Sequence, residues 1–285
     1  MKAGAFVAVI IMGNLLRRAG FFKEEDFYVL SKIVLKITLP AAIISNFSGI
    51  DLKPSMLVMT LLGFGGGILY ITMAFFMSIG KEREERAFNV LNLPGYNIGN
   101  FTMPFAQSFL GPVGVVATSL FDTGNAFVCL GGAYSVAVVT KEKNARFSLL
   151  PVVKTLLKSL PFDAYLIMTV LSFLHVALPA PITSFTGVIG NANAFMAMLM
   201  IGVGFKLNGD SSQPGKIVRI LAARYSLAII LALVFYFLLP FGIEYRQALT
   251  ILALSPMSSA APAFTGNLRS EERRVGKECR SRWSP

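Results

Sequence analysis

Long apolar segments constrain this chain more than any other feature of its sequence. Residues 55–79, 87–110, 113–139 and 217–240 are almost entirely apolar, and each reaches the roughly 20 residues that a helix needs to cross a bilayer. Charged residues make up 14% of the chain and hydrophobic residues 54%. Soluble domains carry about 25% charged residues, so this balance excludes an ordinary soluble fold. The sequence predicts an all-α integral membrane protein.

Shorter apolar segments complete a set of nine expected spans. They cover residues 3–16, 28–48, 55–79, 87–110, 113–139, 162–178, 183–206, 217–240 and 247–267.

The connections between these spans differ in charge on the two sides of the expected bilayer. One side receives Arg17, Arg18, Lys23, Lys81, Arg83, Arg86, Lys141, Lys143, Arg146, Lys154, Lys158, Lys216 and Arg219, and the other receives only Lys2, Lys53 and Arg246. Cytoplasmic loops are enriched in Lys and Arg. We therefore expect a multi-pass protein of the plasma (cell inner) membrane, with its N-terminus outside and its basic loops and tail in the cytoplasm. Because the net charge of +11 comes from such loops, it does not indicate nucleic-acid binding.

The spans divide into two sets around the long polar segment 140–161. Residues 1–139 hold spans 1–5, residues 140–161 are expected to form a cytoplasmic linker, and residues 162–270 hold spans 6–9. An odd number of spans in the first set gives the second set the opposite orientation, which predicts inverted five-helix repeats with a tenth span expected. Residues 271–285 (EERRVGKECRSRWSP) differ abruptly in composition and are predicted to be a foreign or disordered tail.

Two of the spans contain a proline near their middle, at corresponding places in the two sets. Asn100 lies four residues before Pro104 in span 4, and Ser258 lies four residues before Pro262 in span 9. A proline inside a helix frees backbone groups, which are tolerated at membrane depth only against protein or a wet cavity. The pair predicts two broken helices that cross at a common site. The alternative is that each proline merely kinks its helix.

Three stretches resemble the auxin efflux carrier family of membrane transporters. They are NLPGYNIGNFTMPFAQSFLGPVGVVATSLFDTGNAFVCLGG, SPMSSAAPAFTGN and GNLLRRAGFF…LSKIVLKITLPAAIISNF, and the resemblance covers about residues 5–268. It implies a fold similar to sodium/proton antiporters, with ten spans, of which nine are visible here. It also implies that Pro104 and Pro262 are the crossover prolines, that Asn100 flanks the substrate site, and that organic anions such as malate, malonate or auxin are moved.

Amide and hydroxyl side chains near the two prolines are the expected substrate ligands. They are Asn97, Asn100, Gln107, Ser258 and Ser259, beside Pro104 and Pro262. Neutral amides offer both donors and acceptors to a carboxylate, and opened helix ends add N–H groups that favour anions. Hydrogen bonding between helices is the alternative role for each of these side chains.

Asp122 is the only acidic residue deep in an apolar span. A carboxylate at membrane depth is costly and is by default a functional candidate, so we expect Asp122, with Asn125, to couple transport to a proton or another cation. The alternative is a structural acid that hydrogen-bonds to Asn125, Thr123 or Asn97.

Other polar or glycine-rich features indicate structure rather than chemistry. Lys32, Lys36 and Lys206 lie near span ends, and Arg224 lies nearly two turns into the span 217–240; all four are expected to extend toward the membrane surface. The run GFGGG at 63–67 lacks the context of a phosphate loop and predicts close helix packing. The two cysteines, Cys129 and Cys279, have no metal-ligand spacing, so no metal or cofactor is expected.

These features together favour a secondary transporter that moves a small organic anion by alternating access. A sodium- or proton-coupled symporter of the bile-acid type is the alternative within transporters. A membrane-embedded enzyme or a receptor is the alternative from another class, and we expect no enzyme, because the spans hold no evident nucleophile–base pair. The expected partners are the anion, a coupling proton or sodium ion, the lipid bilayer and, with the oligomeric state left open, a second copy in a homodimer.

Overall fold

The described part of the chain is helical throughout. The computed structural model describes residues 2–23, 25–47, 52–142, 148–205 and 214–258. Within these ranges it contains no named strand, and one isolated antiparallel bridge joins Tyr96 and Met257. The substrate candidates Ser259 and Pro262, and the tail 271–285, lie outside the described residues.

Helices cover most of the described chain. In chain order they are α1 (Lys2–Arg18), α2 (Asp26–Ile33), η1 (Val34–Thr38), α3 (Leu39–Phe47), η2 (Pro54–Leu57), α4 (Val58–Met77), α5 (Arg83–Asn92), η3 (Ile98–Thr102), α6 (Met103–Phe127), η4 (Val128–Gly132), α7 (Ala133–Lys141), α8 (Leu150–Leu156), α9 (Leu160–Phe173), α10 (Ala180–Asn191), α11 (Asn193–Gly204), α12 (Pro214–Phe237) and α13 (Ile243–Ala253).

Five helical stretches of the described chain are long and apolar enough to cross a membrane. They are Asp26–Phe47, Pro54–Met77, Ile98–Lys141, Ala180–Gly204 and Ile217–Phe237. The pair Leu150–Leu156 and Leu160–Phe173 would make a sixth, but it is bent by 81°. A membrane-spanning helical protein is therefore plausible, whereas the count of nine spans and the inverted repeats stay predictions.

The long stretch Ile98–Lys141 is interrupted at Gly111 and again at Gly131. Gly111 has φ of +58° and ψ of −147°, a conformation that favours glycine, and Pro112 then begins the next helical part. This turn lies between the predicted spans 87–110 and 113–139, and their being two separate spans stays a prediction.

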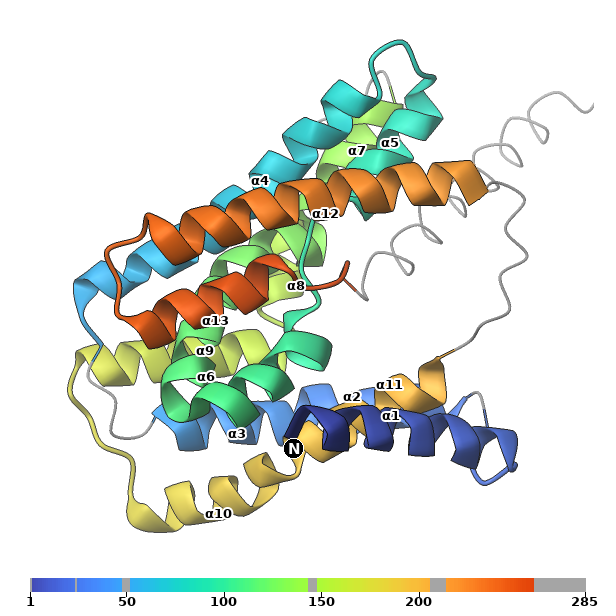
Figure 1. Ribbon diagram of the computed structural model, residues 1–285. Helices are drawn as coiled ribbons and strands as arrows, with labels where there is room; N and C mark the ends of the chain where they lie inside the picture. Colours follow the sequence, from blue (N-terminus) through green and yellow to red (C-terminus); the bar gives the residue numbers. More distant parts are fainter. Residues whose placement is uncertain (1, 24, 48–51, 143–147, 206–213, 259–285) are drawn as a thin grey trace, which may run out of the picture.

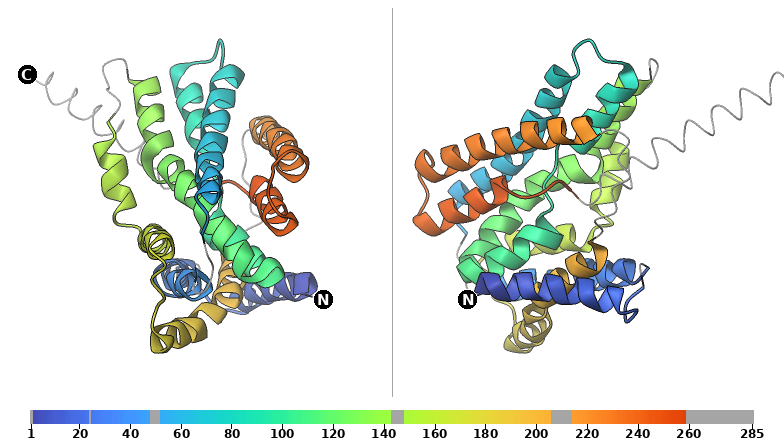
Figure 2. Two further views of the ribbon diagram at one scale, coloured as in Figure 1. Left: turned by 90° about the vertical axis from the view of Figure 1, so that its left-hand side faces the viewer. Right: turned by 45° about the vertical axis from the view of Figure 1, so that its right-hand side comes forward.

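The helices form two packed groups with α6 between them (Figures 1 and 2). In one group α1 packs on α11, and α10 packs on α3. In the other, α4 and α13 pack on α6, and α12 packs on α13. A smaller buried apolar cluster lies around Val34 and Met198, and a larger one around Tyr70 and Phe121 extends to Leu39 and Phe47 of α3. Because α6 also contacts α3 and α11, it joins the two groups.

Glycines allow α4 and α6 to approach until their backbones touch. A Cβ atom added to Gly63 would lie 2.0 Å from the carbonyl oxygen of Phe121, and one added to Gly124 would lie 1.9 Å from that of Thr60. The Thr60 hydroxyl donates to the carbonyl of Leu120 across this contact, at 2.9 Å. The close-packing prediction for the run at 63–67 is confirmed at Gly63.

Replacing Gly63 by alanine should separate α4 from α6 and lower stability. The clash is with backbone, so the expected cost is that of overpacking, about 1–3 kcal/mol, and it outweighs the gain in helix propensity of up to ~1 kcal/mol. Gly65→Ala is the matched control, because a Cβ at Gly65 meets nothing within 4 Å. Thermal unfolding in detergent should show a lower midpoint for Gly63→Ala than for the unaltered chain. Gly65→Ala should not lower the midpoint. Equal midpoints would contradict the contact.

Candidate functional site

The predicted span 4 is interrupted between α5 and η3, earlier than the sequence indicated. Residues 93–97 are not helical, and Gly95 has φ of +84°. We expected the break at Asn100 to Pro104, and this position was wrong. Pro104 lies in the first turn of α6, where a missing N–H costs no helical hydrogen bond. The break instead follows Pro94 and uses the conformational freedom of Gly95.

A second interruption follows α13 and meets the first. Residues 254–258 leave the helix, and Met257 forms the antiparallel bridge with Tyr96. The backbone N–H of Asn97 donates to the carbonyl of Pro256 at 3.0 Å. We call residues 93–97 and 254–258 the paired breaks. The contact uses the residues around Pro94 and Pro256. The expected crossing of Pro104 with Pro262 stays a prediction, because Pro262 lies outside the described residues.

The guanidinium group of Arg224 holds the paired breaks together. Arg224 comes from α12, is 0% exposed, and donates to backbone carbonyls of both breaks. Its Nη1 donates to Leu93 at 2.6 Å, and its Nη2 lies 2.9 Å from the Gly95 oxygen, 2.9 Å from that of Ser255 and 3.1 Å from that of Pro256. The expectation that Arg224 extends to the membrane surface is therefore wrong, because freed carbonyls at this depth supply its partners.

Aromatic rings and a hydroxyl pair complete this centre. The guanidinium carbon lies 4.8 Å from the ring centroid of Tyr70 and 5.5 Å from that of Tyr96, distances typical of cation–π contacts. The hydroxyl groups of Thr102 and Ser255 hydrogen-bond to each other between the two breaks. The one salt bridge within the described residues joins Lys81 and Glu85, so no described carboxylate pairs with Arg224. Its carbonyl partners carry no net charge.

Asp122 and Asn125 bind the first break from α6. The Asn125 amide accepts from the Tyr96 N–H at 3.0 Å and donates to the Tyr96 carbonyl at 3.2 Å. It also donates to Asp122 Oδ1 at 2.8 Å, while the Tyr165 hydroxyl on α9 donates to Asp122 Oδ2 at 2.9 Å. Asn125 was among the partners expected for Asp122. Tyr165 was missed, because nothing in the sequence links residues 43 positions apart.

The other candidates divide between the centre and its surroundings. Asn97 is half-buried just before η3, and its side chain makes no hydrogen bond within the described part of the chain. Asn100 is buried in η3, and the half-buried Ser258 lies against Gly95. Gln107 lies away from the centre and donates to the Gly190 carbonyl at 3.1 Å, which is an interhelical hydrogen bond. The structure thus brings Asn97, Ser258, Asp122 and Asn125 around the paired breaks.

Metal binding has no evident place in this arrangement. Among the described residues, no group of three or more His, Cys, Asp or Glu side chains lies close enough to hold a metal ion.

Comparison with known proteins gives no match, either to a protein-family model or to a curated protein.

Replacing Arg224 should destabilise the protein more than replacing an exposed arginine. In Arg224→Gln the carbonyls of both breaks lose their shared donor, and each buried unsatisfied group costs about 1–3 kcal/mol. Arg224→Lys should recover only part of the loss, because an ammonium lacks the planar fork of donors. Arg83→Gln, at an exposed position in the first turn of α5, is the control. Thermal unfolding in detergent measures all three variants, and an Arg224→Gln midpoint equal to that of Arg83→Gln would refute the role.

Proposed function

We propose that this protein is a secondary transporter that moves a small organic anion, such as a dicarboxylate, across the membrane by alternating access. The observation that carries the proposal is the meeting of two interrupted helices around Arg224. Irregular backbone at membrane depth is typical of transporter binding sites, where helix ends and exposed polar groups face the substrate. The resemblance to auxin efflux carriers agrees with this proposal.

The charge of the centre supports an anion as the substrate. Arg224 is buried, has carbonyl and aromatic neighbours, and forms no salt bridge with a described carboxylate, so its positive charge lies directly at the paired breaks. A fixed positive charge in a poorly solvated site attracts an anion more strongly than it would in water. The Asn97 amide and the Ser258 hydroxyl would then orient the carboxylate by hydrogen bonds.

The same arginine argues against sodium as the coupling ion. A sodium ion at the paired breaks would need carbonyl oxygens as ligands, and Arg224 already uses those of Leu93, Gly95, Ser255 and Pro256. A proton is the better candidate, carried by Asp122. Protonation would turn one of its oxygens from an acceptor into a donor and so disturb the hydrogen bond from Tyr165. That bond links α6 to α9, which makes Asp122 a suitable place for an ion to influence helix positions.

Transport in proteoliposomes tests the substrate class and the coupling separately. The unaltered chain should accumulate a labelled malate-like dicarboxylate when a proton gradient is imposed, and replacing sodium with choline should not change the rate. Asp122→Asn keeps the shape of the side chain, so it should retain exchange of the anion across the membrane while losing the response to the gradient. Asp163→Asn on α9 is the control and should respond like the unaltered chain.

The two ideas fail in different ways in this assay. If no carboxylate moves under any gradient, the transport proposal is wrong. If transport occurs and Asp122→Asn responds fully to protons, only the coupling role of Asp122 is wrong.

A further inference from the structure

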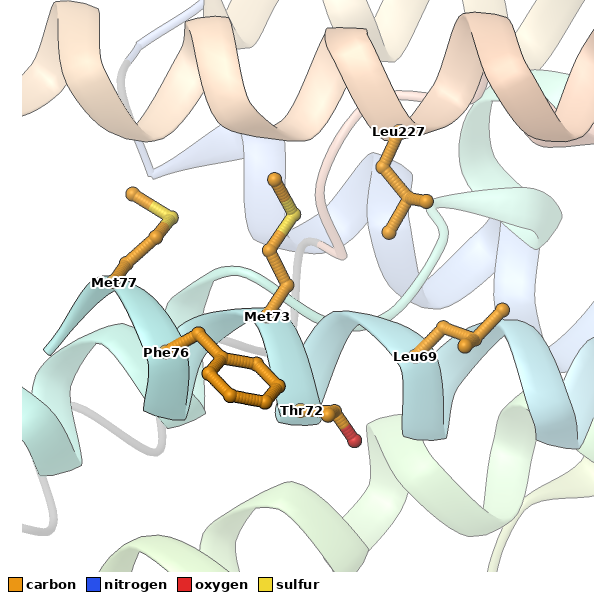
Figure 3. Close-up of a pocket in the computed structure, with 6 residues that line it drawn as sticks. All are labelled: Leu69, Thr72, Met73, Phe76, Met77 and Leu227. Atoms are coloured by element: carbon orange, nitrogen blue, oxygen red, sulfur yellow. The ribbon is translucent and has the colours of Figure 1, made fainter. Parts of the chain in front are cut away.

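An apolar groove runs between α4 and α12 (Figure 3). Its volume is about 540 Å³, and it is lined by Leu69, Thr72, Met73, Phe76, Met77 and Leu227. The Thr72 hydroxyl donates to the Ile68 carbonyl at 2.9 Å, so the one polar lining side chain is already hydrogen-bonded within its own helix. The groove volume lies in the range of ligand pockets, about 300–1,000 Å³, and its walls suit a hydrocarbon occupant.

The groove has a defined basic end. The Arg219 guanidinium donates to the carbonyl of Met77, the last lining residue of α4, at 3.0 Å. Arg86 donates to the adjacent Ser78 carbonyl at 3.2 Å. Arg219 is exposed and makes no ion pair with a described residue, and a guanidinium carries five N–H donors. N–H groups of Arg219 therefore remain to bind a ligand at the end of the groove, beside Met77.

Acidic side chains at this end do not cancel the charge of Arg219. Glu82, Glu84 and Glu85 follow α4 together with Lys81, Arg83 and Arg86, and these six residues balance one another in charge. Glu85 lies 3.7 Å from Lys81. Arg219, contributed by α12, adds the surplus positive charge.

The length of the groove matches one half of a bilayer. Leu69 to Met77 is nine residues, or about 12 Å of helix, and one leaflet contributes about 15 Å of the roughly 30 Å hydrocarbon core. A hydrocarbon chain in the groove, with its polar end at Arg219, would therefore have its tail in the hydrocarbon core and its head at the membrane surface. This requires an amphiphile with a negatively charged head and an apolar tail.

We infer that the groove between α4 and α12 binds an acyl chain of an anionic phospholipid, and that Arg219 holds its phosphate, whose negative charge no cationic group of the same headgroup offsets. Arginine pairs with phosphate through two parallel hydrogen bonds. A bound lipid would add an apolar bridge between α4 and α12, which hydrogen bonds from Tyr70 to the Arg224 carbonyl and from Arg219 to the Met77 carbonyl already join. This inference does not depend on the proposed transport activity.

Native mass spectrometry of the purified, delipidated protein tests the inference. The protein is titrated with dioleoyl phosphatidylglycerol or with dioleoyl phosphatidylcholine. The two lipids share their acyl chains and the phosphate, but the choline of phosphatidylcholine cancels the phosphate charge. One arginine near a membrane surface contributes enough to favour the anionic lipid about five-fold. Arg219→Gln should remove this preference, whereas Arg83→Gln, at the same end of the helices, should keep it.

A second variant addresses the apolar part of the site and guards against misfolding. Leu227→Phe places a larger side chain in the groove without changing any charge, so it should weaken the binding of both lipids in a protein that elutes normally by size. Equal binding of the two lipids by the unaltered protein would overturn the inference. So would a preference that survives Arg219→Gln, or a groove occupied by a second copy of the chain, seen as a dimer that Leu227→Phe dissociates.

Discussion

Four backbone carbonyls that no helix satisfies converge on one guanidinium group, that of Arg224. Two lie in the first break and two in the second. In hydrocarbon each unsatisfied group costs several kcal/mol, so neither break is tolerable without a donor. The planar fork of an arginine suits several oxygens in one plane better than an ammonium does. The position of α12, and the rings of Tyr70 and Tyr96 against the charge, follow from this requirement.

The rest of the centre extends that single interaction in two directions. Toward α4, Gly66 leaves room for the Tyr96 ring, since a Cβ there would lie 2.6 Å from the Tyr96 hydroxyl oxygen. Toward α9, Asn125 and Asp122 connect the backbone of Tyr96 to the hydroxyl of Tyr165. A shift of α9 would therefore be transmitted to the paired breaks through three hydrogen bonds: Tyr165 to Asp122, Asn125 to Asp122, and Asn125 to the Tyr96 carbonyl. This chain of contacts is the physical basis for proposing Asp122 as the coupling group.

Sequence reasoning succeeded where the information is local. The expected span 55–79 corresponds to Pro54–Met77, and the span 217–240 to Ile217–Phe237, because apolar length and flanking charges are both read along one segment. It misplaced the first break, because it took every proline inside an apolar span as a break, whatever its position in a helix. Pro104 lies in the first turn of α6, where it does not interrupt the helix, whereas Pro94 and Gly95 follow the end of α5. It failed for Arg224 because the carbonyl partners lie 129 and 131 residues earlier and 31 and 32 residues later in the chain. A useful signal was present: two interruptions in apolar spans require a buried donor, and Arg224 lies well inside the apolar span 217–240.

Disulfide trapping measures the central contact most directly. Tyr96 and Met257 are paired in an antiparallel bridge, where opposite Cα atoms lie about 4.5–5.5 Å apart, within the range that a disulfide spans. With Cys129 and Cys279 replaced by serine, Tyr96→Cys combined with Met257→Cys should form the disulfide readily in the membrane. Adding Arg224→Gln should reduce its yield sharply. Failure of the pair to cross-link, or an equal yield without the arginine, would contradict a centre in which Arg224 holds two broken helices together.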